Sequence, residues 1–194
     1  EAVITGESLL YNFTNEGGAA GTFRLLKNIM GLWLMQECRR AWTAQGETFS
    51  YGELTRMAAE APPFGPLVDP DCPDFLAPGD MPARLGDFCR RTGQKVPSTK
   101  GTLLRCILES LALKYRLTLE RLEAIVGYPL EVIHIVGGGS RNGLLCRLTA
   151  DATGRPVLAG PVEATTIGNV IVQAMATGDL ASLAEGRALI RRSF

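Results

Sequence analysis

Apolar positions recur at helical spacing in two long stretches of the chain, at about residues 22–44 and 98–125. Spacings of three and four residues place such side chains on one face, so each stretch predicts a long amphipathic helix. A shorter helix is expected over 50–61, because Ser50 and Glu53 have the spacing of a capping box directly before an apolar run. The first part of the chain is therefore predicted to be mainly helical.

The segments between these helices have other patterns. Short β-like runs at 2–5 and 8–13 predict two edge strands, followed by a turn-rich segment. Residues 62–82 contain seven prolines, which lack the amide N–H that helices and central strands require. We expect an irregular excursion over the surface there, and a short helix over 83–92. The apolar anchors of the excursion are expected to be Phe64, Leu67, Val68, Phe75 and Leu76.

The pattern changes in the last third, where short strand-like runs alternate with helical segments. Residues 131–136 form an almost continuous β-branched run, which predicts a strand buried on both faces. Three glycines end it, and Ser140 is the expected N-cap of a helix that reaches about residue 153. A second strand at 156–158 and a helix over 163–177 follow. The order strand, loop, helix, strand, helix predicts an α/β protein.

Composition and charge narrow the possible partners. With 194 residues, 46% of them hydrophobic, the chain can bury the core of one domain. Its 20 basic and 20 acidic residues are interspersed and cancel, so we expect neither nucleic acid nor a membrane surface as a partner. No apolar run approaches the roughly 18 residues of a membrane span, and no signal peptide is evident, which favours a cytoplasmic location.

The five cysteines are scattered, without a CxxC pair and with a single histidine to join them as a ligand. This pattern favours reduced thiols and gives no metal-binding set. His134 alternates with apolar residues in a predicted buried strand, so we interpret it as a core residue. Glu163 could be a carboxylate over a cleft, but at the start of a predicted helix we interpret it as a capping residue that also favours the helix dipole. Trp33 and Trp42 are interpreted as packing residues.

The junction at 132–145 carries the most chemical information. A strand leads into Gly137, Gly138 and Gly139 and then into a helix. Glycines allow a ligand to approach the backbone, and a helix N-terminus offers free N–H groups and the positive end of its dipole to a phosphate. The residues match neither the P-loop nor the dinucleotide-binding pattern. They fit a nucleotide-contacting loop, and they also fit a tight turn that binds nothing.

Three blocks of the sequence resemble the FGGY family of carbohydrate kinases. The run Ile133–Asn142 looks like the family's adenosine-binding signature, and 159–169 looks like the helix that lines its cleft. The block 15–36 is similar to the branch of the family that phosphorylates L-rhamnulose. The blocks occur in the family's order, and the resemblance covers nearly the whole chain, most loosely in the proline-rich stretch and around 40–60.

The resemblance implies that residues 1–194 are the C-terminal, nucleotide-binding domain of a two-domain kinase. Its fold would be the RNase H-like, actin-like α/β ATPase domain, without its leading strands. Asn28 matches a position on the sugar side of the cleft. The predicted helix carries both Asn28 and Gln36, and the two residues would lie about 12 Å apart along its axis. Without the resemblance, both would be interpreted as ordinary solvated positions. The matched positions assign contacts with ATP to Gln36, Gly137, Gly138, Gly139 and Asn142.

The resemblance also implies a reaction, the transfer of a phosphoryl group from ATP, assisted by Mg²⁺, to the 1-hydroxyl of a ketose. L-rhamnulose is the favoured ketose, and L-fuculose or D-xylulose stay open. The family's catalytic aspartate and a Ser-Gly-Thr phosphate loop have no match here and are expected upstream of residue 1. We therefore expect no catalytic base and no activity in this chain alone, and a missing N-terminal domain as its partner. A non-catalytic actin-like nucleotide-binding module is the alternative, against which the 15–36 block argues.

Overall fold

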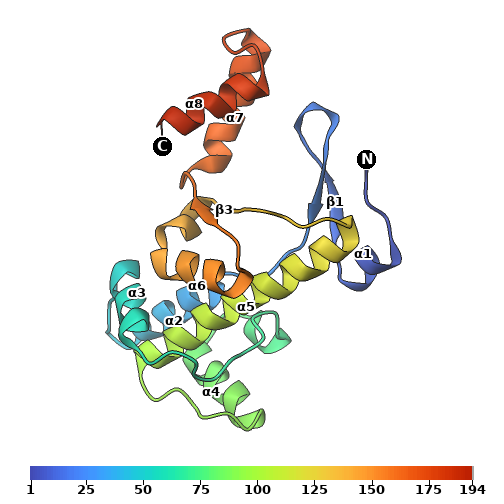
Figure 1. The fold of residues 1–194 in the computed structure, drawn as a ribbon. Helices are drawn as coiled ribbons and strands as arrows, with labels where there is room; N and C mark the ends of the chain where they lie inside the picture. The colour runs from blue at the N-terminus through green and yellow to red at the C-terminus, as the bar shows by residue number, and fades with distance from the viewer. Residues whose placement is uncertain (194) are drawn as a thin grey trace.

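Helix α5 (Lys100–Val126) is the longest element and the support for most of the others. The computed structural model describes residues 1–193, and Figure 1 shows α2, α3, α4 and α6 gathered around the N-terminal half of α5. The buried residues of α5 all lie between Leu103 and Ala112, so this half alone is enclosed by protein. Thr99 caps the helix and Gly127 ends it, which confirms the long helix predicted from the sequence.

The helices that pack around α5 contribute apolar faces to one core. They are α2 (Trp33–Ala44), α3 (Tyr51–Glu60), α4 (Met81–Arg91) and α6 (Gly143–Thr153). The two short helices predicted ahead of α5 are confirmed as α3 and α4. Fully buried side chains of this core include Leu34, Leu54, Leu85, Ile107 and Leu145.

Two small, separate sheets complete the fold. Strands β1 (Thr14–Gly17) and β2 (Phe23–Leu26) pair antiparallel as a hairpin around the short 3-10 turn Ala19–Gly21. Strands β3 (Ile133–Ile135) and β4 (Val157–Ala159) pair parallel. The predicted α/β class is confirmed, although both sheets are narrow in the part of the chain that the structure describes.

Strand β3 is less enclosed than its sequence predicts. Ile133 lies opposite Val157, and β4 is the only partner of β3 among residues 1–193. A strand is buried on both faces only where other elements cover both sides of its sheet. Here His134 is exposed and its two neighbours are half-buried, so the interpretation of a doubly buried strand with a core histidine is wrong.

The N-terminal strands predicted at 2–5 and 8–13 are also absent from the described residues. Gly6–Leu10 forms the short helix α1 instead, and Thr5 and Ser8 cap it reciprocally. The two hydroxyl groups accept hydrogen bonds from backbone N–H groups at the start of the helix. This local stabilisation of a helix outweighs the weak strand pattern of these few residues.

The helix predicted over 22–44 begins only at Trp33. Its first part is β2, which pairs with a segment predicted to be a turn, β1. Leu25, Leu26 and Ile29 match helical spacing, but the hydrogen bonds of the hairpin ladder decide the local structure. Asn28 therefore lies exposed in the loop between β2 and α2 and does not share a helix with Gln36, so the 12 Å estimate does not apply.

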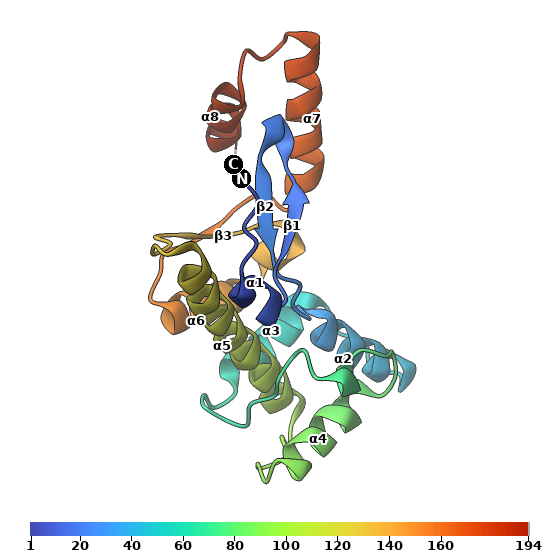
Figure 2. The ribbon, with the colours of Figure 1, turned by 90° about the vertical axis from the view of Figure 1, so that its right-hand side faces the viewer.

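The C-terminal helices α7 (Ala164–Thr177) and α8 (Leu183–Ser193) extend away from the core, on the same side as the β1–β2 hairpin (Figures 1 and 2). Helix α7 and strand β4 confirm the two elements predicted there. No helix within residues 1–193 combines the length and the apolar character that crossing a membrane requires.

The proline-rich segment 62–82 is irregular, as predicted, apart from the 3-10 turn Pro73–Phe75. Val68 and Phe75 are buried and serve as apolar anchors, but Phe64 is 93% exposed and Leu67 and Leu76 are exposed too. Apolar contacts therefore hold this segment at fewer points than the sequence predicts.

Polar side chains of α5 hold the same segment through its backbone. The buried carboxylate of Glu109 accepts hydrogen bonds from the N–H of Phe64 at 3.1 and 3.2 Å, and Arg105 pairs with it at 2.6 Å. The hydroxyl of Ser110 accepts from the N–H of Val68 at 3.0 Å. These buried acceptors satisfy N–H groups that have no helix or sheet to bond them.

All five cysteines are free, as their spacing predicts. Cys38, Cys89 and Cys106 are buried, and burial raises the pKa of each thiol, that of Cys106 to about 12. They are therefore protonated at neutral pH and act as small packing residues. Trp42 is buried among the same helices, which confirms its packing role.

We expect Phe75→Ala to lower the free energy of unfolding by about 3–5 kcal/mol, because it removes a ring that is fully buried and leaves a cavity. Urea denaturation followed by circular dichroism measures this change. Phe64→Ala is the matched control in the same segment, and its exposed ring should change stability by less than about 0.5 kcal/mol. Equal losses in the two variants would contradict the assignment of Phe75 as the anchor.

Candidate functional site

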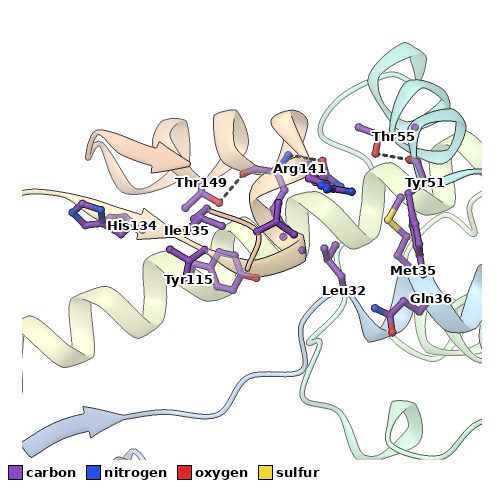
Figure 3. Close-up of a pocket in the computed structure, with 18 residues that line it drawn as sticks. Leu32, Met35, Gln36, Tyr51, Thr55, Tyr115, His134, Ile135, Arg141 and Thr149 are labelled. Carbon is purple, nitrogen blue, oxygen red and sulfur yellow. Dashed lines mark hydrogen bonds between the residues drawn. The ribbon is translucent and has the colours of Figure 1, made fainter. Parts of the chain in front are cut away.

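A cavity of about 1170 Å³ separates the first turns of α2 and α3 from the segment that joins β3 to α6. Figure 3 shows Met35, Gln36, Tyr51 and Thr55 on one side of it and Ile135, Arg141 and Thr149 on the other. The side formed by α2 and α3 consists of Leu32, Met35, Gln36, Tyr51, Gly52 and Thr55. The facing side and floor consist of Tyr115, Ile133, His134, Ile135, Val136, Gly138, Gly139, Arg141, Asn142, Leu145, Thr149 and Val162.

The wall formed by α2 and α3 is set by helix periodicity and capping. Leu34, Met35 and Cys38 face the core, which turns the exposed side chain of Gln36 toward the cavity. The first turn of α3 is fixed by the expected capping box, in which Ser50 and Glu53 exchange backbone-to-side-chain hydrogen bonds of 2.7 and 3.2 Å. Hydrogen bonds from Ser50, the backbone N–H first, lower the pKa of Glu53.

The facing wall is a short glycine turn. Residues Gly137–Arg141 form a 3-10 turn, in which the hydroxyl of Ser140 donates to the carbonyl of Gly137 at 2.8 Å. Helix α6 begins after it, and its N-cap is Asn142, whose Oδ1 accepts from the N–H of Leu145 at 3.0 Å. The prediction of Ser140 as the N-cap is therefore wrong, because the turn inserts between strand and helix.

The three glycines have different structural roles. Gly137 has a left-handed backbone with φ +77°, which favours glycine, and its N–H donates to the carbonyl of Pro161 at 3.1 Å. Gly138 has no such φ, and a Cβ there would meet nothing within 4 Å. The first N–H groups of a turn have no acceptor within it. Neither the backbone conformation nor the packing requires glycine at position 138. Without a side chain there, the backbone N–H groups of the turn are open to the cavity.

Charge in the cavity is concentrated in one side chain. Arg141 is the only lysine, arginine, aspartate or glutamate among the lining residues. None of the ion pairs within residues 1–193 includes Arg141. The site therefore combines apolar and aromatic walls with one arginine and an open glycine backbone. That combination fits a ligand with an apolar ring and an anionic end.

The residues predicted for a nucleotide site come together in part. Gln36, Gly138, Gly139 and Asn142 all line the cavity, with Gly137 adjacent in the turn. Asn28 does not line it. The side-chain oxygen of Asn142 is already engaged in capping α6, a role the sequence did not indicate.

Sequence reasoning missed the contributions of α3, α5 and α6 to the cavity. The capping box at Ser50 identified the start of α3. It could also have predicted that Tyr51 and Gly52, which follow it directly, lie on the exposed first turn of that helix. The capping role predicted for Glu163 is wrong in part: it stands at the N-cap position of α7 but makes no side-chain capping bond, so its effect on that helix is limited to its charge. No group of three or more potential metal ligands of the His, Cys, Asp or Glu type occurs within residues 1–193. The missed lining residues with polar or charged groups are Tyr51, Thr55, Tyr115, Arg141 and Thr149.

Known proteins are similar to this chain over nearly its whole length. A model of the FGGY family of carbohydrate kinases, C-terminal domain, matches residues 1–177. The chain is 52% identical over 191 residues to a rhamnulokinase of Bacteroides thetaiotaomicron, a match that covers 98% of this chain and 39% of that protein. It is 45% identical to a rhamnulokinase of Enterococcus faecalis (98% and 38%) and 40% identical to one of Bacillus subtilis (99% and 39%). The chain thus spans about two fifths of the length of these relatives.

We expect Gly137→Ala to lower the free energy of unfolding by about 1–2 kcal/mol, because a side chain is strained at φ +77°. Gly138→Ala is the matched control, since its backbone is not left-handed and its Cβ would have room. Its stability should stay the same or rise slightly. Chemical denaturation of both variants tests this, and a larger loss at residue 138 than at residue 137 would contradict the roles assigned to the two glycines.

Proposed function

This chain belongs to the FGGY family of carbohydrate kinases, and we propose that it is the ATP-binding half of a kinase that phosphorylates the 1-hydroxyl of L-rhamnulose. The convergence of Gln36 with Gly138 and Asn142 on one cavity is the observation that carries the proposal. Gln36 lies far from Gly138 and Asn142 along the chain, and the family resemblance assigns all three to ATP. We assign Gly137 and Gly139 to the same site.

The orientation of ATP follows from the distribution of polar groups. The adenosine would lie between the glycine turn, which carries the residues that resemble the family's adenosine-binding signature, and the wall of α2 and α3. The phosphate next to it would be within reach of the open N–H groups of the turn and of the guanidinium of Arg141, which can donate to its oxygens. Phosphoryl transfer requires mainly positioning and compensation of charge, which this arrangement can supply without a covalent step on the protein.

Magnesium has no protein cage among the described residues, which contain no cluster of potential ligands. Mg²⁺ usually retains several waters and binds through the phosphates of the nucleotide, so the residues of this chain fit a metal that arrives with ATP. When bound, it neutralises charge on the phosphates. The contribution of the chain itself is to hold and orient the triphosphate.

We assign no catalytic base to this chain. No aspartate or glutamate lines the cavity among residues 1–193. The aspartates of the proline-rich segment are engaged elsewhere, since Asp69 and Asp71 each lie 2.9 Å from Lys114 and Asp74 pairs with Arg91. The aspartate that deprotonates the sugar, the phosphate-binding Ser-Gly-Thr loop and the leading strands of an actin-like sheet would belong to a preceding domain. The greater length of the relatives leaves room for one.

The choice of sugar rests on the relatives and on Asn28. Rhamnulokinases of three bacteria are 40–52% identical to this chain, which supports L-rhamnulose over L-fuculose or D-xylulose. Asn28 is exposed in the loop before α2 and is our candidate for the sugar contact. Its loop is anchored because the N–H of Met30 donates to Asp71 at 2.7 Å.

We expect the full-length protein that contains this chain to phosphorylate L-rhamnulose with ATP and Mg²⁺, about tenfold or more efficiently than L-fuculose or D-xylulose. An assay that couples ADP release to a spectroscopic signal measures kcat/KM for each ketose. Residues 1–194 alone should give no turnover, since we assign no catalytic base to them. Turnover by the isolated chain would contradict that assignment, and ATP binding without turnover of any ketose by the full-length protein would favour a non-catalytic module.

We expect Arg141→Ala to weaken ATP binding by the full-length protein about 10-fold or more, because a charge-assisted hydrogen bond to the triphosphate is lost. Isothermal titration calorimetry measures the Kd. Arg147→Ala is the matched control, since Arg147 is exposed on the next part of α6 and does not line the cavity. A similar effect of both variants would indicate a general effect of charge and contradict a direct contact from Arg141.

A further inference from the structure

The loop of residues 27–32 joins the proposed sugar contact to the proposed nucleotide site. It carries the exposed Asn28, and it ends at Leu32, which lines the cavity. Figure 3 shows the chain leading from the hairpin through this loop to Leu32. The course of the loop therefore sets how the residue that would contact the sugar lies relative to the site that would hold ATP. Phosphoryl transfer depends on this relation, because the two substrates must meet in line.

Almost nothing within the loop itself fixes that course. Among residues 1–193, the backbone of 27–31 makes a single hydrogen bond, from the N–H of Met30. Its acceptor is Oδ1 of Asp71, at 2.7 Å, and the two residues are 41 positions apart along the chain. A carboxylate is a strong acceptor, and this short distance is typical of a charge-assisted hydrogen bond. The middle of the loop is thus held by one side chain of the proline-rich segment.

The other oxygen of the same carboxylate contacts helix α5. Oδ2 of Asp71 lies 2.9 Å from the ammonium of Lys114, which also lies 2.9 Å from Asp69. The side chain of Lys114 is only 13% exposed. Burial disfavours its charge, but hydrogen bonds to the two carboxylates outweigh this effect and raise the pKa of Lys114. The ammonium is therefore charged at neutral pH and holds the carboxylate of Asp71 in one orientation.

The proline-rich segment is fixed in other ways that do not involve Asp71. Phe75 anchors it in the core, and Asp69 forms its own ion pair with Lys114. Both contacts would remain if residue 71 had no carboxylate. The contact that would be lost is the one to the loop, and the N–H of Met30 would then have no acceptor within the protein.

We propose that Asp71 is a positioning residue for the sugar substrate, because it links the loop that carries Asn28 to Lys114 of α5. This inference rests on the proposed function, since it takes Asn28 as the sugar contact. Asp71 acts through the backbone of the loop and touches neither substrate. A loop that is ordered in advance loses less conformational entropy when the sugar binds, so the link raises the affinity for the sugar. The ATP cavity, which Asp71 does not line, is unaffected.

The experiment measures steady-state kinetics of the full-length protein, with L-rhamnulose and ATP varied in turn. Asp71→Ala should lower kcat/KM for L-rhamnulose about 10-fold through a raised KM, while the KM for ATP changes less than about twofold. General damage to the fold would affect both substrates alike. An unchanged KM for L-rhamnulose, or an equal loss for the two substrates, would overturn the positioning role.

Two matched variants separate the hydrogen bond to the loop from the ion pair with Lys114. Asp71→Asn and Asp69→Asn each remove a negative charge beside Lys114 and keep a side-chain oxygen as an acceptor. In Asp71→Asn this oxygen can still accept from the N–H of Met30, so the KM for L-rhamnulose should return to within about threefold of its original value. Asp69→Asn should leave that KM unchanged. A loss in either variant as large as in Asp71→Ala would contradict the role of the hydrogen bond.

Hydrogen exchange followed by mass spectrometry tests the link without any substrate. The peptide that covers residues 27–32 should exchange faster in Asp71→Ala than in Asp69→Asn, because only the first variant releases the loop. In the unchanged protein the amide of Met30 should be protected although it lies in a loop. Exchange of this amide at the rate of an open loop would refute the link even if Asp71→Ala failed to fold.

The same measurements distinguish this inference from the proposed function. Turnover of L-rhamnulose by the unchanged protein, with the same KM in Asp71→Ala, would refute the positioning role alone. Failure of the unchanged protein to phosphorylate L-rhamnulose would refute the proposed function and, with it, the role of Asp71 toward that sugar.

Discussion

The close contact between α3 and α5 at Gly101 is the constraint on which the cavity depends. A Cβ at this position would lie 2.6 Å from the carbonyl oxygen of Met57 and 3.6 Å from the Cβ of Ala61. Helix α3 can therefore lie at this distance from α5 only because residue 101 has no side chain. Helix α6 packs against the same helix and carries the other wall. The separation of the two walls is thus set by the packing of α5 and not by the residues that face the ligand.

Polar side chains of α5 also fix parts of the chain that have no regular structure. In addition to the buried Glu109, α5 carries Lys114, which lies 2.9 Å from both Asp69 and Asp71. Asp71 in turn accepts a hydrogen bond from the N–H of Met30 at 2.7 Å. A line of contacts therefore runs from α5 through the proline-rich segment to the loop that holds Asn28. Prolines give this segment few N–H groups of its own, so a few strong acceptors on a rigid helix fix its course. The proposed sugar-side residue and the proposed ATP-binding residues are positioned by one helix.

What the sequence predicted correctly was local. The capping box at Ser50, the periodicity of α5 and the breaks at the prolines depend on neighbours within a few residues. The errors came where distant partners decide. Residues 22–32 have helical spacing, yet a hairpin forms, and His134 lies in an apolar run, yet nothing in the described chain covers that face. Gathering of Gln36 and Gly138 into one cavity was expected only through the family resemblance, because no spacing along the chain encodes it.

The glycines show how structure and function can be separated in such a site. At Gly101 packing requires glycine, and at Gly137 the backbone does, so neither needs a ligand to explain it. At Gly52 and Gly138 no atom of the protein lies within 3.8 Å of an added Cβ, and neither backbone is left-handed. Glycine lowers stability inside a helix. Gly168 of α7 is equally open and lies away from the cavity, so it is their position on the cavity walls that distinguishes Gly52 and Gly138. These two glycines lie on opposite walls of one cavity. A ligand that contacts both walls explains both exceptions together.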